Sequence, residues 1–194
     1  MPTVPIDIAP ELPEHLQSLR TCSNDELNRL VSTLCLVERL PVAFLDGLTE
    51  EDKIICYRVA LLCYCVTSAM QIPREMQFRV VLTDQHKKDT LVSAGTGSGK
   101  TLPIVLNALL DAPDKKLVTL VISPLKRLQV TQENDFNTRY GIPTVVINED
   151  TPREDTWWTV GWNSLAATSV HYLMALSRKM SGTTASELPG LLDF

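Results

Sequence analysis

The sequence predicts an α/β domain with a parallel sheet, preceded by a small helical module. Two observations predict the domain: a glycine-rich loop lies between a short apolar strand at Leu91 and Val92 and an apolar helix at residues 102–110, and further apolar runs follow at 117–122 and 144–147. With a helical stretch between the last two runs, the order is strand, helix, strand, helix, strand. We therefore expect part of a three-layer domain over residues 73–150, with strands covered on both faces.

Composition excludes several classes of protein. The chain has 194 residues, 44% hydrophobic and 21% charged, which is enough for one globular core. Its formal net charge of −5 excludes a surface that attracts nucleic acid everywhere, but leaves room for a local basic strip. The five cysteines contain no C-x-x-C pair. Free thiols in a reducing compartment are therefore favoured over a zinc site or disulfide bonds.

Residues 54–72 need to be tested as a membrane segment. They approach the length that spans a bilayer, with Arg58 as their one charged residue. That charge, with the polar Thr67 and Gln71, favours a buried helix over the membrane alternative. The N-terminus shows no basic region followed by an apolar core, so no secretory signal is visible. We expect a protein of the nucleus or cytoplasm.

The N-terminal third reads as a tail and a helical module. Residues 1–22 hold several prolines and few large apolar groups, so a poorly ordered tail is expected. Ser23 and Glu26 form a capping-box pattern, which predicts a helix that ends before Pro41. Thr49 begins a second helix, which continues to about Met70. The module, residues 23–72, shows no chemistry, and packing is its default role.

The remaining elements follow in order. A third helix is expected from Arg74 to about Leu82, and Ser123 with Pro124 should cap a helix that runs to Tyr140. Residues 151–194 form an unmatched tail, with one helix expected from residue 165 to residue 180. Its tryptophans, Trp157, Trp158 and Trp162, are interpreted as anchors packed on the sheet rather than as a base-stacking platform.

The loop has the spacing A-x-x-x-x-G-K-T of a phosphate-binding loop, with alanine in place of the usual first glycine. Its glycines can take positive φ angles, so several backbone N–H groups can converge on one anion. Lys100 would reach the outer phosphates, and the Thr101 hydroxyl would ligate Mg²⁺. The alternative is an accidental flexible loop. The expected nucleotide-binding residues here are Ala94, Gly95, Thr96, Gly97, Ser98, Gly99, Lys100 and Thr101.

Three blocks carry a resemblance to a known family. Arg74-Glu75-Met76-Gln77 resembles an R-x-x-Q adenine-recognition motif, residues 94–103 resemble motif I, and residues 121–128 resemble motif Ia. Together, residues 73–154 resemble the first part of the N-terminal RecA-like motor domain of superfamily 2 helicases of the DEAD/DEAH-box type. Within these, they look most like the RecQ-type ATP-dependent DNA helicases of fungi.

The resemblance implies ATP, Mg²⁺ and DNA as ligands. It implies that Arg74 and Gln77 recognise adenine and give a preference for ATP over GTP; a solvated helix glutamine is the alternative. It also implies that the start of motif Ia meets the DNA backbone, and an exposed basic helix turn is the alternative. The residues concerned in motif Ia are Ser123, Pro124, Lys126 and Arg127.

The sequence also departs from the family's pattern. No D-E-x-H box follows the loop, and Asn148-Glu149-Asp150 imitates one poorly. The second motor domain and its arginine finger are not in this sequence. We expect a fragment of a motor that binds ATP and nucleic acid but does not unwind alone, with poor stability unless the helical module fills the gap. Alternatives are a non-catalytic interaction protein with a relic loop, and a small nucleotide kinase, although no arginine-rich lid follows the loop.

Overall fold

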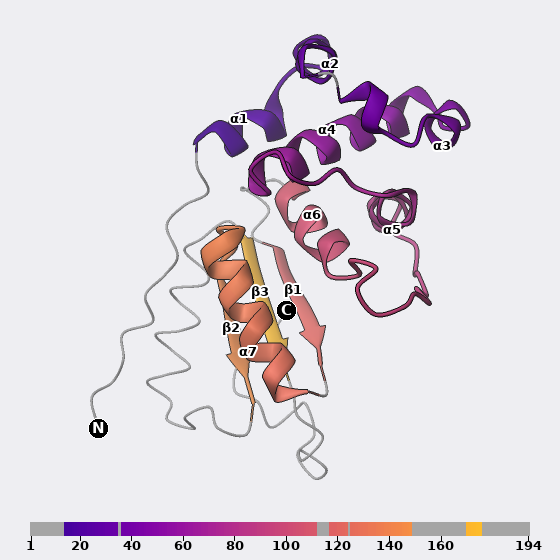
Figure 1. Cartoon of the computed structure of the whole chain (residues 1–194). Coiled ribbons are helices and arrows are strands. Elements are labelled where there is room, and N and C mark those ends of the chain that lie inside the picture. Colours follow the sequence, from indigo (N-terminus) through magenta and orange to yellow (C-terminus); the bar gives the residue numbers. More distant parts are fainter. Residues whose placement is uncertain (1–13, 35, 112–116, 124, 149–169, 176–194) are drawn as a thin grey trace.

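The computed structural model describes residues 14–34, 36–111, 117–123, 125–148 and 170–175 (Figure 1). The N-terminal helices lie together with the helix that follows the loop, and a strand and helix region lies beside them. The elements are α1 (Glu14–Thr21), α2 (Asn24–Thr33), η1 (Val37–Arg39), α3 (Val42–Asp46), α4 (Glu50–Val66), α5 (Glu75–Gln85), α6 (Leu102–Leu110), β1 (Leu117–Ile122), α7 (Lys126–Asn134), η3 (Asp135–Arg139), β2 (Thr144–Ile147) and β3 (Val170–Ala175).

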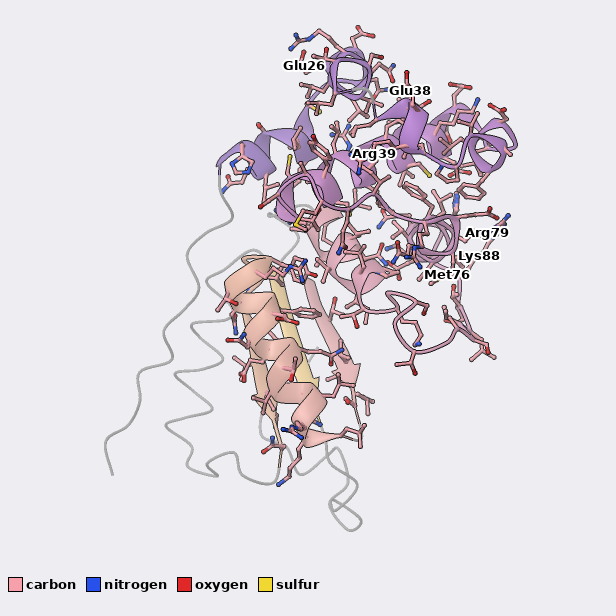
Figure 2. The ribbon with its side chains drawn as sticks, in the orientation of Figure 1. Glu26, Glu38, Arg39, Met76, Arg79 and Lys88 are labelled. Carbon is pink, nitrogen blue, oxygen red and sulfur yellow. The ribbon has the colours of Figure 1, made fainter. Side chains whose placement is uncertain are left out.

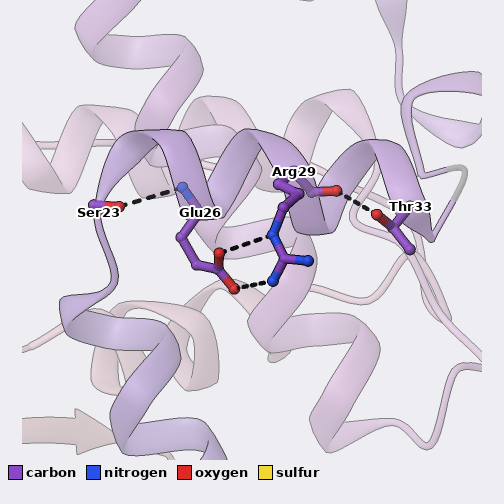
Figure 3. Close-up of polar contacts among 4 residues, drawn as sticks. All are labelled: Ser23, Glu26, Arg29 and Thr33. Atoms are coloured by element: carbon purple, nitrogen blue, oxygen red, sulfur yellow. Dashed lines mark hydrogen bonds and ion pairs between the residues drawn. The ribbon is translucent and has the colours of Figure 1, made fainter.

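Two helices begin at the predicted capping residues. The Ser23 hydroxyl accepts a hydrogen bond from the Glu26 N–H at 3.3 Å, at the start of α2 (Figure 3). Thr49 accepts one from the Asp52 N–H at 3.2 Å, at the start of α4. Each bond satisfies a backbone donor that has no partner within its helix. Both start signals are therefore confirmed.

The first helix corrects the expected N-terminal tail. Residues 14–21 form α1, whose Leu16 and Leu19 are 4% and 9% exposed. The expectation of a poorly ordered segment is wrong for these residues, because the two leucines bury apolar surface in the core. Residues 1–13 lie outside the described part of the chain.

The strands form a parallel sheet in the order β1-β3-β2. Leu117 of β1 lies opposite Val170 of β3, and Thr144 of β2 lies opposite Tyr172. Strands β1 and β2 lie where the sequence predicts them, and α7 packs against β2. The three-layer architecture and the domain boundaries stay predictions.

The central strand corrects a second expectation. Residues 170–175 lie inside the helix expected over 165–180, which is therefore wrong for this segment; its flanks lie outside the described residues. Both neighbours, β1 and β2, pair with β3, so its backbone groups bond on two sides. Such pairing overrides a local helix pattern, because strand preference depends mainly on context.

The strand expected before the loop is also absent. Residues 90–95 have no regular secondary structure, and Leu91 is 98% exposed. A strand needs a partner for its N–H and C=O groups, and no described strand pairs with this segment. The segment has few apolar residues, and they do not hold it as a strand when no partner strand bonds its backbone groups. Within the described residues the order is therefore α6, β1, α7, β2 and β3.

A single hydrophobic core joins the helical module to the helix that follows the loop. Helix α6 packs against α4 and α5 (Figure 1). The most completely buried large side chains include Leu27 of α2, Leu62 of α4, Phe78 of α5 and Leu106 of α6. The charged side chains of Glu38 in η1, Arg79 in α5 and Lys88 shortly after α5 are exposed (Figure 2). The helical module therefore covers α6.

The apolar segment at 54–72 belongs to this core. Most of it lies in α4, where Cys56, Val59 and Leu62 are fully buried. Thr67 ends the helix, and Ser68 and Ala69 take positive φ angles directly after it. Across the described ranges, none of the helices combines the length and the apolar character that crossing a membrane requires.

Candidate functional site: the loop before helix α6

The glycine-rich loop adopts a turn that depends on its glycines. Gly97 and Gly99 have φ angles of 79° and 80°, a region that side-chain-bearing residues rarely adopt. The Ser98 N–H donates to the Gly95 carbonyl at 3.3 Å, which closes the turn. A Cβ built on Gly95 or Gly97 would meet no atom within 4 Å, so the backbone there borders open space. A ligand can approach the backbone closely at this point.

Lys100 folds back over the loop. Its ammonium group donates hydrogen bonds to the carbonyl oxygens of Ala94 and Gly95, each at 2.8 Å. These bonds tie the end of the loop to its beginning. Both acceptors are neutral, whereas hydrogen bonds to a charged phosphate oxygen are about twice as strong. The ammonium group thus lies in the loop, where it can exchange two carbonyl partners for an anion.

Helix α6 begins directly after Lys100. Thr101 is its N-cap residue, and the Thr101 side chain makes no capping hydrogen bond. Pro103 lies in the first turn, where its missing N–H costs no helix bond. Val105, Leu106 and Leu109 are fully buried and fix the helix in the core. The positive end of the helix dipole is therefore held at the loop.

Gln77 connects α5 to the loop. It is 4% exposed; its side-chain Oε1 accepts from the Arg74 N–H at 2.8 Å, and its Nε2 donates to the Gly99 carbonyl at 3.0 Å. The alternative of a solvated glutamine is therefore wrong. Arg74 is exposed at the N-cap of α5. Recognition of adenine by Arg74 and Gln77 stays a prediction.

These residues fit a nucleoside triphosphate with Mg²⁺. The backbone at Gly95 and Gly97 is open to a ligand, the Lys100 ammonium lies within the loop, and the Thr101 hydroxyl is not used as a helix cap. The two positive φ angles are typical of loops in which successive N–H groups surround an anion. The site therefore has a cation, an open backbone turn and an uncapped hydroxyl in adjacent positions, which are the groups that phosphates and a metal ion would need.

Motif Ia differs from its expected arrangement. Ser123 is 5% exposed, its hydroxyl has no partner among the described residues, and its carbonyl accepts from Gln129 Nε2 at 2.6 Å. Helix α7 begins at Lys126 with Leu125 as its N-cap, so the expected cap by Ser123 and Pro124 is wrong. Gln129 is fully buried and holds the Ser123 carbonyl. Pro124 lies outside the described residues, and Arg127 is exposed.

The acidic segment after β2 is described only in part. Asn148 Nδ2 donates to Gln129 Oε1 at 3.4 Å, and Glu133 Oε1 accepts from the Val146 N–H at 3.0 Å. Glu149 and Asp150 lie outside the described residues. The part of the chain that the structure describes holds no cluster of three or more His, Cys, Asp or Glu side chains able to bind a metal ion.

Two arginines that bond the C-terminal ends of helices were missed by the sequence analysis. Arg20 of α1 donates to the carbonyls of Ala108 and Leu109, and Arg58 of α4 donates to the carbonyls at the end of α1. Arg20 fell in the expected tail, and Arg58 was noted only as a charge in an apolar helix. A basic residue in the last turn of a short helix was the available signal, but it does not identify the partner helix.

The loop and the helix after it have the spacing and the backbone geometry that are typical of a phosphate-binding loop. The chain belongs to the DEAD/DEAH box helicase family, whose model matches residues 74–181, more than half of the sequence. Membership of this family indicates a RecA-like fold for the helicase domain.

Curated proteins from two rodents are similar to the chain. "Probable ATP-dependent RNA helicase DDX52" of Mus musculus is 34% identical over 91 residues, which is 45% of this chain and 15% of the relative. The protein of the same name from Rattus norvegicus gives the same figures. The chain therefore spans about 15% of the length of these relatives. No solved structure matches the chain significantly.

The family match revises the extent of the resemblance. The sequence motifs placed its end at residue 154 and left residues 151–194 as an unmatched tail, but the family model continues to residue 181. The short motifs quoted above end before this region, so they could not detect it. The family level of the resemblance is confirmed, whereas the finer likeness to RecQ-type DNA helicases is not supported by the relatives found.

Proposed function

We propose that the chain binds ATP with Mg²⁺ through the loop at residues 94–101 and contributes this site to a nucleic-acid helicase. The observation that carries the proposal is the Lys100 ammonium held within a loop in which Gly97 and Gly99 have positive φ angles. Family membership supports it, because DEAD/DEAH box domains generally use ATP with Mg²⁺.

Each part of the site would have a separate role. The backbone of Gly95, Gly97 and Gly99 would surround the phosphates, and Lys100 would neutralise their outer charge. The Thr101 hydroxyl would ligate Mg²⁺, which supplies charge neutralisation to the phosphates when it is bound. Gln77 would keep Gly99 in position from α5.

Titration with a fluorescent ATP analogue in the presence of Mg²⁺ tests the proposal. Lys100→Ala should weaken binding at least about tenfold, because it removes the one side-chain cation of the loop. Lys53→Ala is the matched control, since Lys53 pairs with Glu50 on the surface of α4 and should leave binding unchanged. Negligible binding by both the unmodified chain and Lys100→Ala would contradict the proposal.

A second candidate is a non-catalytic interaction protein with a relic loop. One observation favours it: the Lys100 ammonium already bonds two backbone carbonyls, so its charge has partners within the loop. If this candidate is correct, ATP should raise the melting temperature of neither the unmodified chain nor Lys100→Ala. A melting temperature that rises with ATP concentration in the unmodified chain alone would exclude it.

For the nucleic acid, we propose single-stranded RNA. The curated relatives are titled RNA helicases, which supports RNA, whereas the motif resemblance suggested RecQ-type DNA helicases. The exposed Arg127 at the start of α7 would contact the phosphate backbone. Fluorescence anisotropy with RNA and DNA oligonucleotides of one sequence decides between them. Tighter binding of the DNA would overturn the proposal of RNA. The nucleus or the cytoplasm stays the proposed location of the protein.

A further inference from the structure

Two arginines link three helices of the structure by bonding the C-terminal ends of α1 and α6. Arg58 of α4 donates from Nη1 to the Leu19 carbonyl at 2.5 Å and the Arg20 carbonyl at 2.9 Å, and from Nη2 to the Cys22 carbonyl at 3.0 Å. These carbonyls lie at the C-terminal end of α1. Arg20, in the last turn of α1, donates from Nε to the Leu109 carbonyl at 2.5 Å and from Nη2 to the Ala108 carbonyl at 3.0 Å.

These contacts stabilise helix ends. The last carbonyls of a helix have no partner within the helix, and a cation there also interacts favourably with the helix dipole. A guanidinium group is planar and holds its donors in a fixed geometry, so it can bond two adjacent carbonyls at once. The bonds of both arginines are partly buried, where water competes less for them. Arg58 thus fixes the end of α1, and Arg20 fixes the end of α6.

Helix α6 is short enough for one end to affect the other. It has nine residues, and helices of this length are marginal on their own because the first turn is costly to form. Its N-terminal end is bonded to the phosphate-binding loop, since the Leu102 N–H donates to the Gly99 carbonyl at 3.2 Å. Arg20 binds the opposite end. Loss of order at the C-terminal end therefore reduces the fraction of molecules in which the loop is correctly formed.

We propose that Arg20 is a positioning residue for the phosphate-binding loop, and that Arg58 supports it by fixing α1. The inference rests on the proposed binding of ATP and assigns the N-terminal helices a role in its affinity. A site that is formed in only a fraction of the molecules binds its ligand more weakly by that fraction. By linkage, bound ATP stabilises the end of α6 by the same factor.

The test measures the affinity of the full chain and its variants for a fluorescent ATP analogue with Mg²⁺. Arg20→Ala should bind about three- to tenfold more weakly, which is a typical size for coupling between two sites. Arg20→Lys keeps the charge but loses the two-carbonyl geometry, so its affinity should lie between those of the unmodified chain and Arg20→Ala. Arg58→Ala combined with Arg20→Ala should weaken binding less than the product of the single effects, because both act through one chain of contacts.

Arg29→Ala is the matched control. Arg29 lies on α2 and pairs with Glu26 on the same helix, with an exposed side chain (Figure 3). Its removal deletes a guanidinium group without touching α6, so the affinity should not change. Amide hydrogen exchange gives the second readout: Arg20→Ala should speed exchange at residues 104–111, and saturating ATP analogue should restore part of the protection.

The outcomes separate this inference from the proposed function. Failure of the unmodified chain to bind the ATP analogue overturns the proposed function in the first titration. Binding by the unmodified chain with equal affinity in Arg20→Ala overturns the coupling alone. Circular dichroism selects a temperature at which each variant is folded, so a loss of stability is not counted as a loss of affinity. If Arg20→Ala does not fold, folded Arg20→Lys with unchanged affinity overturns the coupling.

Discussion

Gln77 on α5 donates a hydrogen bond to the carbonyl oxygen of Gly99, 3.0 Å away, so the helix before the phosphate-binding loop holds the loop's last glycine. The same amide accepts a bond from the Arg74 N–H. Because Gln77 is buried, water replaces neither bond readily when the side chain is removed.

Gln77→Ala should lower the free energy of unfolding by about 1–3 kcal/mol and weaken ATP binding, because two backbone groups lose a buried partner. Gln77→Glu keeps the acceptor for Arg74 but loses the donor to Gly99, so it should weaken ATP binding as well. Urea unfolding and titration of the ATP analogue measure the two effects. Gln71→Ala, at an exposed glutamine, is the control. An unfolding midpoint shared by Gln77→Ala and the unmodified chain would contradict the prediction.

Gly99→Ala should destabilise the chain by about 1–3 kcal/mol because an alanine at a positive φ angle is strained. Its Cβ would also lie 2.5 Å from Gln77 Nε2, so the hydrogen bond from Gln77 would break. Gly47→Ala is the matched control. Gly47 has a φ of −83° and its added Cβ would lie 3.6 Å from the nearest atom, so its effect should stay within about 1 kcal/mol. Thermal unfolding compares the two, and equal losses would refute the prediction.

Ser123→Ala should leave stability unchanged or raise it by up to about 1 kcal/mol. The Ser123 hydroxyl is buried without a partner among the described residues, and a buried polar group in that state is unfavourable.

Arg127→Ala should instead weaken binding of single-stranded nucleic acid and lower its salt dependence, because Arg127 is exposed. Fluorescence anisotropy at several salt concentrations measures the affinity for nucleic acid and its salt dependence. Weaker binding by Ser123→Ala at unchanged stability would show that the serine reaches the ligand.

The stability of the chain should fall as the pH rises above about 9. Burial raises the pKa of the Cys56 and Cys63 thiols to about 12 from an ordinary value of 9.0. Between these values the folded chain keeps protons that the unfolded chain loses, so the free energy of unfolding decreases with rising pH and the contribution is fully present below pH 9. Urea unfolding of the unmodified chain and of Cys56→Val at several pH values above 9 isolates the contribution of one thiol to the free energy of unfolding. Parallel curves for the two would contradict the prediction.

Local signals in the sequence identified the elements that depend on neighbouring residues alone. Ser23 and Thr49 cap their helices as predicted, because each bonds an N–H three residues away. Gly97 and Gly99 take the positive φ angles expected of the loop. These features are determined within a few residues of the chain, so a sequence pattern is sufficient to find them.

Features that depend on distant partners were missed. Strand β3 exists because β1 and β2 pair with it, whereas the segment around Leu91 has no described partner and forms no strand. The burial of Ser123 depends on Gln129 in the next helix, and the role of Arg20 depends on α6, almost 90 residues further along the chain. No pattern in a single sequence gives these partners. The roles of the loop residues in binding ATP stay predictions.

The shared core has a practical consequence for dissecting the protein. A chain shortened to begin at residue 73, where the family resemblance starts, would lose α4 and expose the apolar side of α6 to water. Leu106 and Leu109 of α6, now fully buried, would then face solvent. Such a truncated protein should aggregate on expression, and negative results for nucleotide binding obtained with it would say nothing about the intact polypeptide.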